Sequence, residues 1–145
     1  MNPTDTLVQI RSLTKAYEKF CAPIRQETGL GQREIDIIAF LKNNPERNTA
    51  KDIVELRMMP KTNVSFGVDA LMQSGYISRE TDPKDRRRLH LKLTEPGNTI
   101  AEKVTTIQNQ FAQMLFTDFT AEDKKNFSKI SQQLTENAIK YLGGH

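Results

Sequence analysis

Residues 76–93 read YISRETDPKDRRRLHLKL, in which two extended segments enclose a basic turn. Apolar and polar side chains alternate strictly over residues 89–93, which is the period of a strand with one buried face. Four basic side chains fall within five residues of the turn: Lys84, Arg86, Arg87 and Arg88. The pattern predicts a β-hairpin with a basic tip, and a basic tip on its own is most often a solvated turn.

Two short helices are expected before the hairpin. Asn48 is the predicted N-cap of the first, which runs to about Arg57, and Pro60 opens the second, which stops at Ser74 and Gly75. The second helix directs its apolar residues inward: Val64, Val68, Leu71 and Met72. Polar residues face outward on its first turns: Lys61, Thr62, Asn63 and Ser65. The pair predicts a helix-turn-helix, although a polar first turn also begins many helices that bind nothing.

The distribution of charge indicates a polyanionic partner. The net charge is +3, and the whole excess lies in residues 47–97, which hold ten basic and seven acidic residues. A helix-turn-helix places the start of its second helix in the DNA major groove, and a basic hairpin directly after it can reach the neighbouring minor groove. The predicted partner is therefore double-stranded DNA.

Further helices are expected on both sides. Residues 5–24 and 95–116 each carry an apolar stripe at steps of three and four, and a broader apolar face over residues 35–41 predicts a central helix. Thr120 followed by Asp123 caps a last helix. The expected fold class is mainly α with a small β-hairpin, a winged helix-turn-helix domain with additional N- and C-terminal helices.

Residues 69–97 resemble the signature of the MarR (multiple antibiotic resistance) family of bacterial regulators. The matching positions are Leu71, Gly75, Ile77, Arg79, Asp82, Pro83, Asp85, Arg87, Leu93, Thr94 and Gly97. The resemblance implies one MarR-type domain over residues 1–145. Within it we expect a winged-helix DNA-binding lobe over residues 31–97 and dimerisation helices over residues 1–27 and 98–145.

The resemblance also implies roles for the residues of the wing. Lys84 and Arg86 at the tip reach the DNA, and Arg88 contacts the DNA or only supplies charge near a phosphate. Three residues are implied to brace the wing through mutual ion pairs: Asp82, Asp85 and Arg87.

The recognition helix departs from the family pattern at Phe66 and Gly67. Phe66 either touches a thymine methyl group or packs inward, and Gly67 permits close packing or a close backbone approach. The candidate recognition residues are Lys61, Thr62, Asn63, Ser65 and Phe66.

A homodimer reading a pseudo-palindromic operator is implied by the same resemblance. The first and last helices carry apolar residues on more than one side, and the candidates for the pairing surface are Leu7, Ile10, Ile130, Leu134 and Leu142. Family ligands often lie between the dimerisation helices and the DNA-binding lobe. The residues that could line such a crevice, or equally form core, are Tyr17, Phe20, Ile24, Ile38 and Phe111.

Cys21 is the only cysteine, so an internal disulfide is excluded and a reducing compartment is indicated. We expect it to be a buried structural residue, with a thiol-based redox sensor as the alternative. No metal or cofactor is expected, because the only histidines are His90, outward on its strand, and His145. The sequence also lacks the paired carboxylates, phosphate loop and activated nucleophile of an enzyme.

No apolar stretch has the pattern of a signal peptide or a membrane span, so we expect a cytoplasmic protein. The predicted function is a DNA-binding transcriptional regulator, a repressor that a small molecule releases from its operator. The alternative is a winged-helix module that binds acidic protein surfaces without specific DNA binding.

Overall fold

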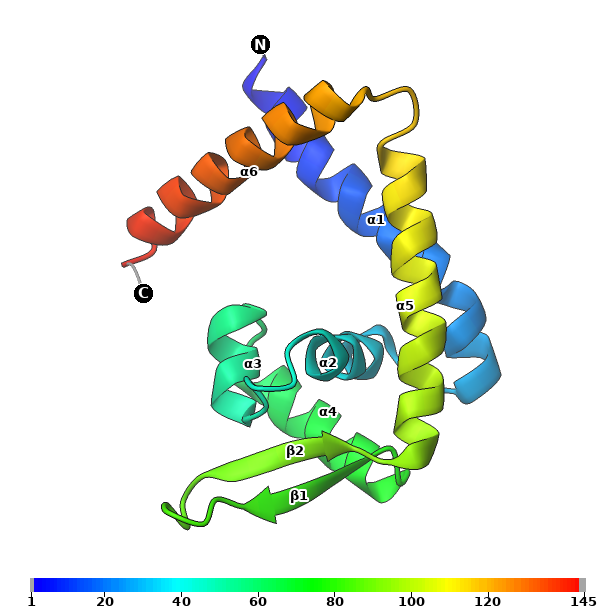
Figure 1. Cartoon of the computed structure of the whole chain (residues 1–145), viewed down its shortest axis with the longest axis vertical. Helices are drawn as coiled ribbons and strands as arrows, with labels where there is room; N and C mark the ends of the chain where they lie inside the picture. Colours follow the sequence, from blue (N-terminus) through cyan, green and yellow to red (C-terminus); the bar gives the residue numbers. More distant parts are fainter. Residues whose placement is uncertain (1, 144–145) are drawn as a thin grey trace. The chain divides into compact units, whose positions relative to one another are not determined.

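The computed structural model describes residues 2–143, in which six helices and a two-stranded sheet follow one another (Figure 1). The elements are α1 (Pro3–Thr28), α2 (Gln32–Asn43), α3 (Ala50–Leu56), α4 (Lys61–Gln73), β1 (Ile77–Thr81), β2 (Leu89–Leu93), α5 (Glu95–Leu115) and α6 (Ala121–Tyr141). The predicted class, mainly α with a small β-hairpin, is confirmed. The chain divides into two compact units, residues 1–111 and residues 112–145.

α1 has a defined beginning and end. The side chain of Asn2 accepts a hydrogen bond from the amide of Thr4, and the carboxylate of Asp5 accepts one from the amide of Asn2, which completes a capping box. Gly29 ends the helix at a φ of 74°, a left-handed conformation that glycine adopts without a steric cost. The break predicted at this glycine is confirmed.

α2 lies at the centre of the first unit, where it contacts α1, α4 and β2. Its residues Ile35, Ile37 and Ile38 are completely buried. Because these side chains leave the helix in different directions, α2 is covered on more than one side. The central position predicted from its broad apolar face is confirmed.

A glycine allows α4 to pack closely against α2. A Cβ atom on Gly67 would lie 2.5 Å from Cδ1 of Ile37 and 3.2 Å from Cγ of Arg33. Gly67 is therefore the residue that lets the two helices approach, and the close packing predicted for it is confirmed.

Thr49, not Asn48, caps α3, so the predicted N-cap is wrong by one residue. The hydroxyl of Thr49 accepts a hydrogen bond from the amide of Asp52, and the Asp52 carboxylate accepts one from the amide of Thr49. Asn48 instead forms hydrogen bonds with the second strand of the hairpin. Its carbonyl accepts a hydrogen bond from the amide of Leu91 at 2.8 Å, and its Oδ1 lies 2.5 Å from Nδ1 of His90.

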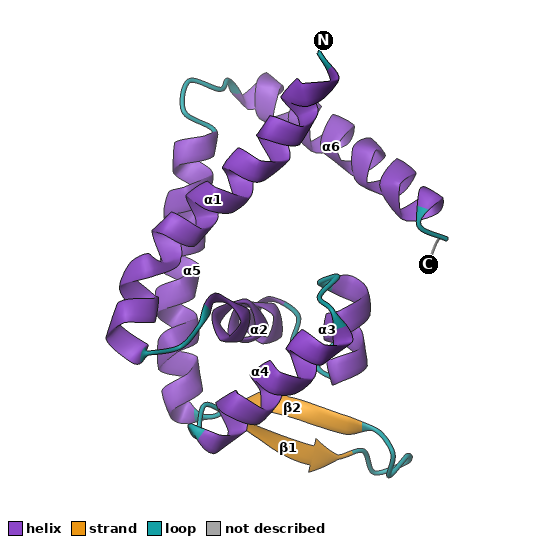
Figure 2. Ribbon diagram, turned by 180° about the vertical axis from the view of Figure 1, so that it is seen from behind, coloured by secondary structure: helices purple, strands orange, loops and turns teal. Residues whose placement is uncertain are grey.

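β1 and β2 form an antiparallel hairpin in which Ile77 pairs with Leu93 and Arg79 pairs with Leu91. Ile77 and Leu91 are buried, so one face of the hairpin joins the core. The predicted strand over residues 89–93 is confirmed. Figure 2 shows the hairpin beside α4, with its turn directed away from α5.

The second unit consists of the end of α5, a turn and α6. Thr120 and Asp123 form the predicted capping box at the start of α6. Phe116, Phe119 and Phe127 meet edge to face, with ring centroids 5.3 to 6.5 Å apart. No side chain of α6 is buried in the single chain, although several of its exposed residues are large and apolar.

Gly97 fixes the start of α5 against the beginning of the hairpin. The hydroxyl of Thr94 donates to the carbonyl of Gly75 and accepts from the amide of Gly97, at 2.6 and 3.2 Å. A Cβ atom on Gly97 would lie 2.0 Å from the carbonyl oxygen of Tyr76, which is backbone and cannot rotate away.

The change Gly97→Ala is therefore expected to lower the free energy of unfolding by about 1 to 3 kcal/mol, the usual cost of overpacking. Urea denaturation monitored by circular dichroism measures this change. The control is Thr99→Ala, an exposed position on the same helix, where the effect should be much smaller. Equal unfolding midpoints for Gly97→Ala and the unmodified protein would contradict the argument.

Candidate nucleic-acid interface

The start of α4 has one buried and one exposed face. Val64, Val68 and Leu71 are buried and anchor the helix to the core, and Met72 is half-buried. The predicted recognition residues of the first turns are all exposed: Lys61, Thr62, Asn63 and Ser65. The predicted orientation of the helix is confirmed, and it presents donors and acceptors of the kinds that contact base edges.

Phe66 lies on the exposed face of α4, with 59% of its surface accessible. The inward alternative considered for this ring is therefore wrong. The guanidinium carbon of Arg33, at the start of α2, lies 5.9 Å from the ring centroid, within the range of a cation–π contact. The sequence analysis did not identify Arg33 as a neighbour of Phe66. Gly67, which leaves room for another side chain against α4, was the only feature of the sequence that could have indicated it.

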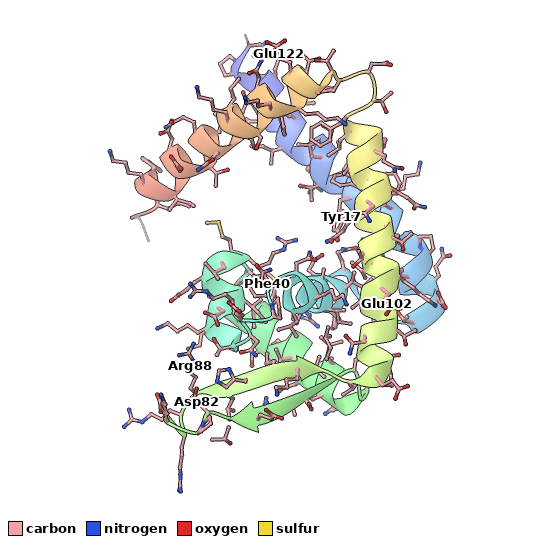
Figure 3. The ribbon with its side chains drawn as sticks, in the orientation of Figure 1. Tyr17, Phe40, Asp82, Arg88, Glu102 and Glu122 are labelled. Carbon is pink, nitrogen blue, oxygen red and sulfur yellow. The ribbon has the colours of Figure 1, made fainter. Side chains whose placement is uncertain are left out.

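The tip of the wing is organised by two aspartates that accept backbone hydrogen bonds. Oδ1 of Asp82 accepts from the amides of Lys84 and Asp85, at 2.8 and 3.1 Å. Oδ1 of Asp85 accepts from the amide of Arg87 at 3.0 Å. The four basic side chains of the tip are all exposed: Lys84, Arg86, Arg87 and Arg88. Figure 3 labels Asp82 and Arg88 at the turn end of the hairpin.

The structure differs here from the predicted bracing of the wing. The ion pairs of residues 2–143 include none between Arg87 and Asp82 or Asp85. The two aspartates accept hydrogen bonds from backbone amides of the same tight turn. Holding the long Arg87 side chain against them would cost more conformational entropy. The two carboxylates brace the wing, but they do so through the backbone.

His90 connects the wing to the helix-turn-helix, so the prediction that it simply faces outward is wrong. Its Nε2 lies 2.8 Å from Oδ2 of Asp82, and its Nδ1 lies 2.5 Å from Oδ1 of Asn48. The ring is half-buried and bridges the wing tip to the residue just before the cap of α3. We call Asn48, His90 and Asp82 the wing latch.

The hydrogen bond from His90, followed by the amides of Lys84 and Asp85, lowers the pKa of Asp82 to about 2. The carboxylate form is therefore the one that fits the latch.

Two hollows open beside these elements. One, of about 570 Å³, lies between α3 and the wing, where Lys51, Arg87 and Arg88 border it together with Asp52 and Asp85. The other, of about 530 Å³, lies between α3 and α4, with Lys61, Ser65 and Arg79 in its wall. The surface that joins the recognition helix to the wing is thus concave and mixed in charge.

The five residues suggested for an effector crevice fall into two groups. Tyr17, Phe20 and Phe111 gather edge to face, with the ring of Phe111 5.3 and 5.9 Å from the other two. Ile24 and Ile38 are buried core residues. Burial raises the pKa of Tyr17 to about 12, and its hydroxyl accepts a hydrogen bond from the Gln108 amide. The structure therefore brings three of the five together and leaves two in the core.

Cys21 is completely buried, as the structural interpretation predicted. Among residues 2–143, no cluster of three or more His, Cys, Asp or Glu side chains is arranged to hold a metal ion. His145 lies outside the described residues. None of the described helices combines the length and the apolar composition that crossing a membrane requires.

These elements define a winged helix-turn-helix protein. A family model described as "MarR family" matches residues 28–88. The solved structure of the MarR protein from Peptoclostridium difficile DA00132 superposes with a TM-score of 0.82, at 18% identity, over 95% of this chain and 90% of that one. The family match over residues 28–88 and the shared fold support the assignment of the chain to the MarR family.

Curated relatives match about half to three fifths of the chain. The HTH-type transcriptional regulator YwhA of Bacillus subtilis is 31% identical over 88 residues, which are 61% of this chain and 63% of the relative. The transcriptional repressor MprA of Escherichia coli is 31% identical over 74 residues, which are 51% of this chain and 42% of MprA. The matched stretch thus spans less than two thirds of either relative. Both relatives carry the names of transcriptional regulators, and neither name is that of an enzyme.

The wing latch predicts a pH-dependent hairpin tip. Because the pKa of Asp82 is about 2 in the folded chain and about 4 in an unfolded one, the carboxylate stabilises the wing above pH 4, and this contribution is lost as the pH falls through 2. In a carbon-13 NMR titration, the Asp82 carboxyl is expected to titrate near pH 2, and His90→Ala should move its midpoint toward the ordinary value.

Glu80→Gln is the control for this titration, because Glu80 pairs with Lys92 and takes no part in the latch. Its effect on the Asp82 midpoint should be small. A midpoint that is the same with and without the His90 ring would exclude the latch.

Proposed function

We propose that the chain is a sequence-specific DNA-binding transcriptional regulator. In this proposal α4 enters the major groove, and the wing contacts the adjacent backbone and minor groove. One observation carries it: the polar side chains of the first turns of α4 are exposed beside a basic wing tip that the latch holds in place. The relatives YwhA and MprA, which are transcriptional regulators, support the same function.

The electrostatics of the wing support a phosphate partner. Among the ion pairs of residues 2–143, none involves the four basic side chains of the tip: Lys84, Arg86, Arg87 and Arg88. Cations without a carboxylate partner bind DNA phosphates without first breaking an internal pair, and they release counterions as they bind. Lys84 and Arg86 are the proposed tip contacts, with Arg88 contributing charge near a phosphate.

A module that binds acidic proteins is the alternative function. It would use the same basic tip, but it would not require the exposed polar residues of α4, which suit base edges better than a carboxylate surface. Selection of bound duplexes from a random-sequence pool distinguishes the two. Recovery of a shared sequence supports the regulator, and uniform recovery of all sequences contradicts it.

The regulator is proposed to act as a homodimer. α6 buries no side chain within the single chain. The five residues suggested for the pairing surface are all at least 59% exposed: Leu7, Ile10, Ile130, Leu134 and Leu142. Apolar residues at this density are typical of helices that pack against a partner. Two recognition helices would then read half-sites about 10 base pairs apart, one turn of DNA.

The relative MprA of Escherichia coli is a transcriptional repressor, and we propose the same role here, in the cytoplasm where a bacterial chromosome lies. The aromatic group of Tyr17, Phe20 and Phe111 is the proposed effector-responsive region. A redox mechanism through Cys21 is disfavoured because an oxidant cannot reach a side chain with no exposed surface without a local opening of the fold.

Replacing Lys84 or Arg86 by Ala is expected to weaken operator binding by about 1 to 3 kcal/mol, because each change removes one charged DNA contact. The thermal unfolding midpoint should hardly change, since both side chains are exposed. Fluorescence anisotropy with the selected duplex measures the affinity. Lys103→Ala on α5 is the control, and equal affinities of all three variants would show that the tip is only a solvated turn.

Leu134→Glu is expected to convert the dimer into a monomer, because it places a charge in the proposed apolar interface. Operator affinity should fall with it, since a monomer reads only one half-site. Analytical ultracentrifugation and anisotropy measure the two effects. The neighbouring change Gln133→Glu adds the same charge outside the apolar stripe and should leave both unchanged. A Leu134→Glu dimer with full affinity would contradict the pairing surface.

A further inference from the structure

The recognition helix has almost no charge of its own to offer a DNA backbone. α4 contains one basic residue, Lys61, and one acidic residue, Asp69, which pairs with Arg79 at 3.4 Å. Beyond its first turn, the helix presents the exposed ring of Phe66 and no cation. A cation beside the middle of α4 must therefore come from another element.

Arg33 of α2 is that cation. Its aliphatic stem passes over Gly67, where an added Cβ would lie 3.2 Å from Cγ and 3.6 Å from Cδ of the arginine. The stem therefore crosses the backbone of α4 at the one position without a side chain. This brings the guanidinium beside the ring of Phe66, 5.9 Å from its centroid.

Among residues 2–143, the guanidinium has one hydrogen-bond partner, the neighbouring Glu34. Its Nη2 donates to the carboxylate of Glu34 at 3.2 Å, and Glu34 is buried. Its Nε is enclosed and has no acceptor in the described part of the chain, which costs free energy in the free protein. The Arg33 side chain is still 39% exposed, so donors remain on its open side.

Phe66 stands one turn after the exposed residues Thr62 and Asn63, on the same side of α4. An aromatic ring here can contact the methyl group of thymine, the apolar feature of the major groove. Arg33 covers part of the ring and limits its rotation, because a stacked guanidinium favours a single arrangement.

We propose that Arg33 and Phe66 act as one DNA-reading unit, in which Arg33 binds a backbone phosphate beside the major groove and positions Phe66 against a thymine methyl group. The inference rests on the proposed DNA-binding function and adds a residue from outside the recognition helix and the wing. Arg33 is a phosphate contact and a positioning residue, whereas Phe66 reads the base.

The test uses the full chain and the duplex selected with the unmodified protein. Arg33→Gln retains the first part of the stem over Gly67 but removes the charge, and Lys103→Gln on α5 removes the same charge elsewhere. The slope of log affinity against log salt should fall by about 1 for Arg33→Gln and stay unchanged for Lys103→Gln, since one phosphate contact is lost.

The second readout replaces each thymine of that duplex by uracil, which removes only the methyl group. One position should weaken binding of the unmodified protein about fourfold, the effect of one buried methyl group. Phe66→Ala should abolish this difference. Arg33→Gln and Arg33→Lys should reduce it, and Arg33→Lys should keep the salt slope because it keeps the charge.

An unchanged salt slope in Arg33→Gln, or the absence of any thymine whose methyl effect depends on Phe66, would overturn the inference while the proposed function stands. If the unmodified protein prefers no duplex sequence, the proposed function itself fails. Circular dichroism confirms folding of each variant. If Arg33→Gln does not fold, a full methyl effect in Arg33→Lys overturns the positioning role.

Discussion

The direction in which α4 faces depends on how it packs against α2. Val64, Val68 and Leu71 enter a core in which the isoleucines of α2 are completely buried, and Gly67 lets the two helix backbones approach. Because a helix turns residues three and four apart to the same side, burying these positions leaves Thr62, Asn63 and Phe66 outside. Rotating α4 would bury polar side chains without partners, so the core determines which residues are available to a ligand.

The wing depends on a different kind of interaction. A two-stranded hairpin is at best marginally stable by itself, and Ile77 and Leu91 attach only its base to the core. The tip is held by hydrogen bonds from backbone amides to Asp82 and Asp85, and by the contact of His90 with Asn48. The carboxylates of the turn bind backbone amides, and within residues 2–143 the exposed basic side chains of the tip form no ion pair.

Buried residues are distributed unevenly along the chain. The middle contributes most of the buried residues, whereas α6 contributes none and α1 exposes Leu7 and Ile10. The net positive charge is confined to the same middle segment. Charge and most of the core therefore lie in the middle of the chain, which also exposes Leu56, Met58 and Phe66, whereas α6 exposes large apolar side chains and buries none.

Much of this protein follows from local pattern. Apolar periodicity predicted the helices and the hairpin. Gly29 predicted the end of α1, and Thr120 with Asp123 predicted the start of α6. These features could be predicted because caps and periods depend on residues within one or two turns. The outward polar turn of α4 and the burial of Cys21 were predicted on the same basis.

The tertiary structure decided what depends on residues far apart in the chain. Asn48 lies 42 residues before His90, and their contact makes a strand histidine part of the wing latch. Arg33 reaches Phe66 only because α2 crosses α4 at Gly67. A local pattern specifies which face of an element is buried, but the partners of its polar side chains are set by the packing of elements distant in sequence.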